Sequence, residues 1–399
     1  MTFRDVFGVA EFRALWLAQL LSVVGDQLAR VALTILVYDR TRSAFLAAVT
    51  FVASVIPTFV GGVTLAWLAD KYPRRRVMII CDLVRCGLVL IMAIHGMPIV
   101  VLVVLLFVVT LVGAPFTSAR AAVYPDVLDG DQYVVGTAIT LTTNQFAQVI
   151  GFAAGGALDG FLGTGRSLLI DAATFACSAA IVRVWVRARP AAGFGAEPGA
   201  SRRGGLTGGI RLVFGNPVLR ISMLFGWLAA LYNVPEGVVT PLASSLHGGA
   251  TTVGVILAAA ALGETIGALL FSRFVSQSAR LRWMGPLAIV SCLFLVLFAA
   301  KPALPGVLAI LLAGGLCACY QIAANAAFVS ATPRDMRSQA FGLALGGITL
   351  GQGTVMIVAG AVAQSVSPSL VIAVCGGIGT VLAAVLAVNW SHRDKRGGD

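Results

Sequence analysis

The chain alternates long runs of apolar, uncharged residues with short polar segments. Residues 43–69 contain no charged side chain, and residues 77–97 are apolar except for Asp82 and Arg85. Between these two runs, residues 70–76 read Asp-Lys-Tyr-Pro-Arg-Arg-Arg. An apolar run of about 20 residues is long enough to cross the hydrocarbon core of a bilayer as a helix. The pattern therefore predicts two membrane-spanning helices joined by a polar loop.

The same alternation continues along the chain and predicts an all-α polytopic membrane protein with twelve transmembrane helices in two bundles of six. The predicted helices lie at residues 13–39, 43–69, 77–97, 99–119, 133–161, 167–187, 218–246, 250–276, 283–300, 304–329, 338–365 and 368–390. We expect an N-terminal bundle at 1–187, a cytoplasmic linker at 188–217 and a C-terminal bundle at 218–399. The linker is rich in Gly and Pro, and its part from 205 onward has the pattern of a short amphipathic helix.

The chain also resembles itself when it is shifted by 206 residues. Residues 61–76 then fall without a gap on residues 267–282, so that Arg74 meets Arg280 and Arg76 meets Arg282. The same shift places Glu236 opposite Arg30. Internal repeats of this size in a membrane protein indicate a transporter whose two halves move about a central binding site.

Composition and charge agree with a membrane protein. Hydrophobic residues make up 58% of the chain, charged residues 11%, and the mean hydropathy is +0.93. The net charge of +11 would suggest a nucleic-acid partner in a soluble chain, but most of the 28 Lys and Arg fall on alternate loops and the two ends. The opposite loops hold only Arg40, Arg42, Arg166 and Lys301. By the positive-inside rule, both termini are expected in the cytoplasm, and no nucleic-acid partner is expected.

The loop at residues 70–76 resembles the signature between helices two and three of the major facilitator superfamily. Ala66 and Pro73 depart from the usual residues of that signature. Further similar segments lie at 22–26, 82–85, 119–126, 208–220 and 331–333, and the set looks most like the bacterial branch that holds macrolide-type drug exporters and the enterobactin exporter. The resemblance implies a twelve-helix fold in the bacterial cytoplasmic membrane. It also implies that the loop closes the cytoplasmic gate through Asp70, Arg74, Arg75 and Arg76.

A second signature lies in the predicted fifth helix, where Gly151, Gly155 and Gly156 occur in one stretch. Glycines four residues apart strip one helix face of side chains, so that a partner helix can pack closely against it. The stretch also resembles the glycine-rich motif of superfamily antiporters, which would favour export by exchange. The sequence leaves both interpretations open.

Charged residues inside predicted spans are candidates for proton coupling, because a charge at bilayer depth is costly. Asp26 and Arg30 are four residues apart and share a helix face, so they could also simply neutralise each other. Glu264 has only small and apolar neighbours in the sequence, and Glu236 follows Pro235, where we expect the helix to kink. We expect these four charged residues to line a central cavity, with a possible pair between Arg30 and Glu236.

Uncharged polar residues on the helices that the resemblance places around the cavity are candidates for substrate binding. They are Asn144, Gln145, Gln148, Tyr232, Asn233, Tyr320, Gln321, Asn325 and Gln352. By contrast, helices three and six are expected outside the cavity, which makes Asp82, Arg85, Asp171 and Arg183 structural residues.

Several chemistries are not predicted. The chain has no Gly-x-x-x-x-Gly-Lys-Ser/Thr loop, its seven cysteines form no Cys-x-x-Cys pair, and its three histidines are scattered, so we expect no ATPase, cofactor or metal site. No cluster suited to a hydrolase is evident, and an enzyme is not expected. The sequence therefore predicts a monomeric secondary transporter that exports small amphipathic, drug-like molecules in exchange for protons, with a mild preference for lipophilic cations. The alternatives are export of a siderophore or other metabolite by the same fold, and lipid handling by a flippase.

Overall fold

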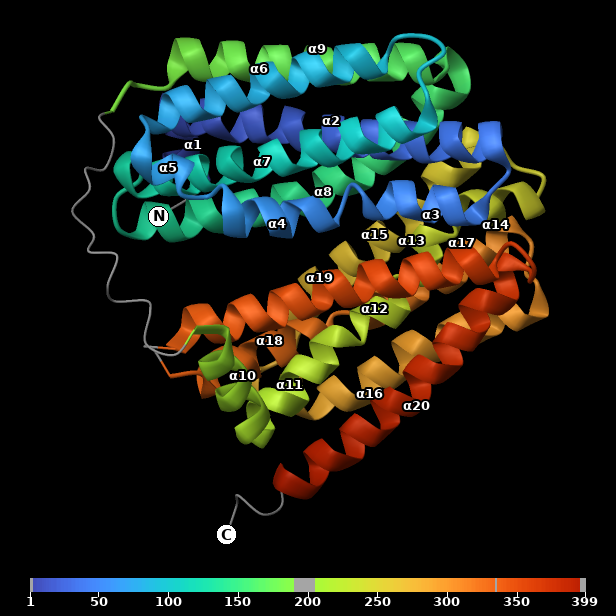
Figure 1. The fold of residues 1–399 in the computed structure, drawn as a ribbon. Helices are drawn as coiled ribbons and strands as arrows, with labels where there is room; N and C mark the ends of the chain where they lie inside the picture. Colours follow the sequence, from blue (N-terminus) through green and yellow to red (C-terminus); the bar gives the residue numbers. More distant parts are fainter. Residues whose placement is uncertain (1–2, 190–204, 334–335, 395–399) are drawn as a thin grey trace. The chain divides into compact units, whose positions relative to one another are not determined.

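The computed structural model describes residues 3–189, 205–333 and 336–394, and its described elements are helices (Figure 1). Ten of these helical segments are long and apolar enough to cross a membrane. Two more of the twelve predicted spans are also helices of comparable length, but they carry more charged or polar residues. They are α6 (Arg74–Met92) and α8 (Asp131–Leu162). The described part of the chain is thus all-helical, with ten spans identified by length and composition.

The chain divides into two compact units, which are described separately below. The first unit comprises Met1–Arg42, Thr50–Glu197 and Gly248–Ala258, and the second comprises Ser43–Val49, Pro198–His247 and Ala259–Asp399. The first unit holds α1 (Phe3–Gly8), α2 (Ala10–Thr41), α4 (Ile56–Thr64), α5 (Leu68–Lys71), α6, α7 (Ile99–Val127), α8 and α9 (Thr164–Trp185). The second holds α10 (Gly205–Gly215), α11 (Pro217–Trp227), α12 (Ala229–Tyr232), α13 (Val234–Gly237), α14 (Val239–Ser245), α16 (Gln277–Val296), η1 (Leu297–Ala300), α17 (Leu304–Cys317), α18 (Tyr320–Ala331), α19 (Arg337–Val362) and α20 (Pro368–Asp394). Helices α3 (Ala44–Val52) and α15 (Ala250–Phe274) contribute residues to both units.

Three of the predicted spans are interrupted rather than continuous. The span predicted at 43–69 breaks between α3 and α4, just before Pro57, and the span at 218–246 divides into four short helices around Pro235 and Pro241. The span at 304–329 breaks between α17 and α18. Proline has no backbone N–H and clashes with the preceding turn, which explains the first two breaks. Interrupted helices leave backbone carbonyls free inside the protein, where they can bind polar side chains.

The predicted linker lies mostly outside the described residues, because 190–204 are not described. Its last part forms α10, as the amphipathic pattern suggests. The predicted division at 187 and 218 stays a prediction.

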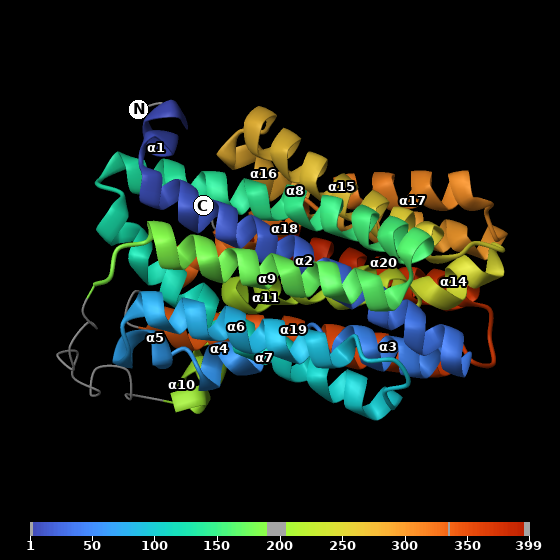
Figure 2. The same ribbon diagram turned by 90° about the horizontal axis from the view of Figure 1, so that it is seen from above.

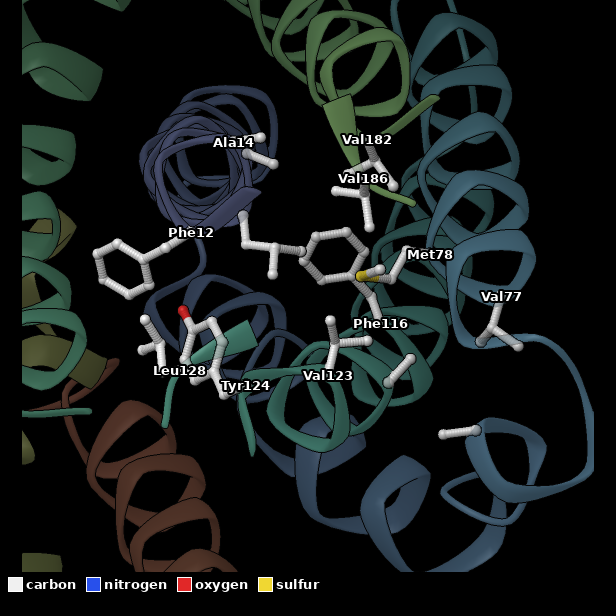
Figure 3. Close-up of a cluster of buried hydrophobic side chains, with 14 of the residues drawn as sticks. Phe12, Ala14, Val77, Met78, Phe116, Val123, Tyr124, Leu128, Val182 and Val186 are labelled. Carbon is white, nitrogen blue, oxygen red and sulfur yellow. The ribbon is translucent and has the colours of Figure 1, made fainter. Parts of the chain in front are cut away.

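The first unit has an apolar core at the end that carries the loop between α5 and α6. Phe12 of α2 and Phe116 of α7 are almost completely buried there, Phe12 beside Tyr124 of α7 and Phe116 beside Met78 of α6 (Figure 3). Burying a large apolar side chain contributes roughly 1.5–3 kcal/mol. This core holds the ends of α2, α6, α7 and α9 together and thereby positions the polar residues of the next turns.

Candidate functional site

A polar cavity of about 280 Å³ lies inside the first unit. It is lined by α2, α6, α7, α4 and the break that precedes α4. Three charged side chains reach it, namely Asp26, Arg30 and Arg85. Two of them were predicted for a central cavity, whereas Arg85 was expected to be a structural residue outside it.

Arg85 of α6 is the centre of the charged groups around this cavity. Its side chain is 2% exposed, and its guanidinium forms an ion pair with Asp26 of α2. The same guanidinium donates a hydrogen bond to Ser22 Oγ at 2.9 Å and lies 4.0 Å from the ring centroid of Phe175. Gly113 of α7 lies beside the guanidinium without a side chain of its own, so α7 can approach closely. Helix α6, the third of the predicted spans, therefore contributes to the cavity through the long side chain of Arg85.

Two more carboxylates interact with Arg85 without lining the cavity. Asp82 is completely buried, lies 3.8 Å from Arg85 Nη1 through Oδ1, and accepts a hydrogen bond of 2.5 Å from Ser178. Asp171 is also completely buried and interacts electrostatically with Asp26 and Arg85. Its Oδ2 atom has no hydrogen-bond partner. The guanidinium of Arg85 thus interacts with three carboxylates, so negative charge is in excess around this buried group.

Arg30 reaches the cavity from α2, one turn after Asp26. Its Nη2 donates to the backbone carbonyl of Ser54 at 3.2 Å, and its guanidinium lies 5.4 Å from the ring centroid of Phe51. Ser54 belongs to the break between α3 and α4, so its carbonyl is not used by a regular helix. The helix break therefore creates the binding partner that holds this cation in place.

The second unit brings together four of the residues that the sequence analysis selected. Glu264 of α15 interacts electrostatically with Glu236, and both acids interact with Tyr232. Tyr320 interacts with Glu264 in the same way. Tyr232 and Tyr320 are 2% and 0% exposed, and neither hydroxyl has a hydrogen-bond partner among the described residues. These side chains form a second polar cluster, which consists of two acids and two tyrosines.

Close helix packing fixes the backbone around Glu264. A Cβ atom built on Gly315 of α17 would lie 2.8 Å from the backbone nitrogen of Glu264. Gly263 and Gly267 also lie against the backbone of α17, at Leu312 and Leu316. The small residues on both sides of Glu264 thus allow α15 and α17 to touch along their backbones.

The predicted gate loop shows different contacts for each of its arginines. Arg74 Nη1 donates to Asp126 Oδ2 and to the Ala122 carbonyl, both at 2.8 Å. Arg75 donates to the backbone carbonyl of Arg183, and Arg76 is exposed. The side chain of Asp70 lies outside the described part of the structure. The gating role of these four residues stays a prediction.

The predicted substrate-binding residues are distributed over both units. In the first unit Asn144 accepts a hydrogen bond of 3.2 Å from Gln19, which itself lines the cavity. The remaining members of the predicted set, apart from the two buried tyrosines, are partly or largely exposed: Gln145, Gln148, Asn233, Gln321, Asn325 and Gln352. Their role as substrate contacts stays a prediction.

The glycines of α8 are packed against other helices of the first unit. A Cβ atom on Gly151 would lie 2.7 Å from Gln27 Cβ, and one on Gly155 would lie 3.2 Å from Val31 Cβ, both on α2. On another face, a Cβ on Gly156 would lie 2.6 Å from Gly254 Cα of α15. These contacts agree with the packing interpretation of the glycine stretch.

Comparison with known proteins identifies the family. The family model of the Major Facilitator Superfamily matches residues 15–236 and 236–398. The chain belongs to the Major Facilitator Superfamily. It is therefore a multi-pass membrane protein and a transporter rather than an enzyme, as the sequence predicted.

Relatives of this superfamily member include an exporter. The chain is 27% identical to the enterobactin exporter EntS of Shigella boydii serotype 4 (strain Sb227) over 345 residues, which cover 83% of this chain and 80% of the relative. Solved structures with the same fold include the nucleoside transporter NupG, with a TM-score of 0.72 and 17% identity, covering 94% of this chain and 98% of that one. A POT family transporter in complex with 5-aminolevulinic acid has a TM-score of 0.73 at 11% identity, with 94% and 95% covered. A bacterial homologue of the iron transporter ferroportin has a TM-score of 0.70 at 13% identity, with 98% and 100% covered.

The residues that sequence reasoning missed in this superfamily member are Arg85, Ser22 and Gln19. In the usual arrangement of the superfamily, the third span, which is α6 here, lies outside the central cavity. Arg85 was therefore expected to be a structural residue. A charged residue in the middle of a predicted span was the available signal, because such residues are rarely neutral in function. Among the described residues, no group of His, Cys, Asp or Glu is suited to hold a metal ion.

Proposed function

We propose that this superfamily member is a secondary active exporter of small amphipathic molecules in the bacterial cytoplasmic membrane, working by alternating access and proton antiport. The family assignment supports transport, and the exporter relative supports the outward direction. The observation that carries the proposal beyond the family is the ion pair between buried Arg85 and Asp26 on the wall of the polar cavity.

The cavity charges support a substrate that carries an anionic or strongly hydrogen-bond-accepting group. Arg30 and Arg85 place two guanidinium groups on the cavity wall beside one lining carboxylate, Asp26, whereas Asp82 and Asp171 interact with Arg85 but do not line the cavity. The expected preference for lipophilic cations set Arg30 against Asp26, Glu236 and Glu264, and Arg85 adds a second cation that weakens this preference. Planar guanidinium groups bind carboxylates and related anions with two parallel hydrogen bonds.

The buried acids support proton coupling at the same place. Arg85 can neutralise one carboxylate, while Asp26, Asp82 and Asp171 all lie within its electrostatic range. Keeping several carboxylates ionised at bilayer depth is costly, so this cluster is suited to bind and release a proton. Asp26 is the member that faces the cavity, and its side chain is 35% exposed. We propose that the proton exchanges at Asp26 and that Glu236 and Glu264 contribute a second proton-binding cluster.

A siderophore is the second substrate candidate, and two observations favour it. The relative that covers most of the chain is named an enterobactin exporter. The two cavity guanidiniums also suit a ligand rich in oxygen acceptors better than they suit a lipophilic cation. Both candidates require the same fold and the same exchange mechanism.

Proton flux in sealed proteoliposomes tests the proposal. Vesicles with an interior pH dye are exposed to lipophilic cations, macrolides and siderophores, and the protein is compared with Asp26→Asn and Glu264→Gln. Asp39→Asn is the matched control, because Asp39 lies on the same helix but is 59% exposed and does not line the cavity. We expect compound-dependent proton movement in the unchanged protein and in the control, and its loss in Asp26→Asn.

Three outcomes would contradict the proposal. Substrate flux that moves no protons in the unchanged protein would replace antiport by facilitated diffusion. Scrambling of fluorescent phospholipid without any added compound would instead indicate a lipid-handling protein. Persistence of coupling in Asp26→Asn together with its loss in Glu264→Gln would move the proton site to the second unit.

A further inference from the structure

A second cavity of the first unit has no part in the transport site. It is a groove of about 510 Å³ between the first turn of α6 and the residues that follow α9. These two helices run side by side (Figures 1 and 2). The groove is lined by Pro73, Arg75, Arg76, Ile79, Arg183, Ala188 and Arg189. Four of these seven described residues are arginines and none is acidic.

Among the side chains that the structure describes, Arg189 is the one groove arginine with a carboxylate partner. Arg189 forms an ion pair with Glu11, and this hydrogen bond raises the pKa of Arg189. Arg75 has a buried Nε atom without a hydrogen-bond partner, although its other end contacts the Arg183 carbonyl. Arg76 and Arg183 are exposed. The groove therefore keeps an excess of positive charge.

The start of α6 adds to this excess. Its first turn contains three arginines and no acidic residue. Cations at a helix N-terminus face the positive end of the helix dipole, which favours anions there. Mutual repulsion and the dipole both work against this arrangement, and a bound anion would relieve both.

Apolar side chains continue from the groove along the outer surface of the two helices. On α6, Ile80 and Leu83 are 59% and 54% exposed and lie one and two turns beyond Arg76. On α9, Val184 and Trp185 are 73% and 59% exposed and lie directly beside Arg183. Exposed apolar residues next to a tryptophan at the end of a span are typical of a surface that faces lipid at the membrane interface.

We propose that this groove binds the phosphate group of an anionic phospholipid, whose acyl chains lie along the exposed apolar faces of α6 and α9. Arginine clusters between helices at the membrane interface suit phosphate headgroups, because the guanidinium fork matches phosphate oxygens. The adjoining apolar surface selects a lipid over a soluble phosphate. Arg75 and Arg76 then hold lipid, whereas Arg74 of the same turn contacts Asp126.

Native mass spectrometry of the purified full chain in detergent, titrated with phosphatidylglycerol, tests this site. The variant Arg76→Gln/Arg183→Gln removes two groove cations. Its matched control is Arg211→Gln/Arg282→Gln, which removes the same charge from two exposed arginines elsewhere, one of them the counterpart of Arg76 in the 206-residue shift. We expect saturable binding of one phosphatidylglycerol, weakened at least about 10-fold in the groove variant and unchanged in the control.

Further measurements distinguish an anionic lipid from a zwitterionic lipid and from a soluble phosphate. Phosphatidylcholine is expected to bind at least about 10-fold more weakly than phosphatidylglycerol, and glycerol 1-phosphate is expected not to compete at the same concentration. The charge-conserving variant Arg76→Lys/Arg183→Lys, which serves if the Gln variant does not fold, is expected to keep most of the binding. Equal loss in the control, equal binding of the zwitterionic lipid, or full competition by the soluble phosphate would each overturn the proposal.

Discussion

Replacing Arg85 by Gln should be among the most destabilising single changes in the first unit. The substitution leaves Asp82, which is completely buried, and Asp26 without their cation. Removing one partner of a buried ion pair costs about 3–5 kcal/mol, because the remaining charge is left uncompensated. The guanidinium also lies 4.0 Å from the ring of Phe175, and the loss of this contact adds about 1 kcal/mol. Since Asp26 is 35% exposed and can be solvated, we expect a total loss of about 3–4 kcal/mol.

A double-mutant cycle separates the charge from the volume of the side chain. Asp82→Asn in the Arg85→Gln background removes the buried charge that the first change left unpaired, so stability should partly return. We expect a coupling free energy of about 2 kcal/mol between the two positions. The assay is the free energy of unfolding of the micelle-bound protein, measured by titration with a denaturing detergent and followed by circular dichroism.

The result that would refute this reasoning is specific. A loss below about 1 kcal/mol for Arg85→Gln would mean that the three carboxylates do not depend on the guanidinium. Additive losses in the double variant would mean that Arg85 and Asp82 do not interact, although Nη1 and Oδ1 lie 3.8 Å apart.

Three further predictions concern packing, the loop and the second polar cluster. Gly151→Ala should lower the free energy of unfolding by about 1–3 kcal/mol, because its new Cβ would collide with α2. Gly342 has open space around it, so Gly342→Ala should be neutral or stabilising by about 0.5 kcal/mol. Thermal unfolding of both variants checks this pair of expectations. Arg74→Gln should cost less than about 1 kcal/mol of stability because its ion pair is partly exposed, yet should reduce the transport rate in proteoliposomes if the loop closes a gate; an unchanged rate would remove it from gating. Glu264→Gln should keep the fold, because an amide of the same size replaces a carboxylate that has no described cation beside it. The same variant should alter the pH dependence of transport. An unchanged pH profile would make Glu264 a packing residue.

The location of the spans followed from the sequence because it depends on local composition. Long apolar runs must form helices in a bilayer, where every backbone polar group needs an internal partner. A kink at Pro235 was predicted, but the break before Pro57 and the break between α17 and α18 were not. Proline in a membrane helix can kink it or end it, and neighbouring helices decide between the two outcomes.

The partners of the charged residues were beyond the sequence. Asp26 and Arg30 share a helix face, which suggested that they could neutralise each other. In the structure Asp26 receives Arg85 from another helix, 59 residues further along the chain. Asp171 approaches the same group because Gly25 of α2 has no side chain that would block it. Such contacts depend on how helices pack, and sequence periodicity describes only one helix at a time.

The sequence by itself determined the membrane setting and marked the charges inside spans as unusual, because both depend on the free energy of transferring residues into lipid. It also indicated the superfamily, because the motifs that carry the resemblance are local stretches of sequence. Only the tertiary structure decided which charges meet. It assigned Arg85 to the polar cavity, separated Arg74 from the neighbouring arginines of its turn, and grouped Glu236 and Glu264 around two buried tyrosines. The physical reason is that burial makes an unpaired charge costly, while the position of its partner is set by helices that are distant in sequence.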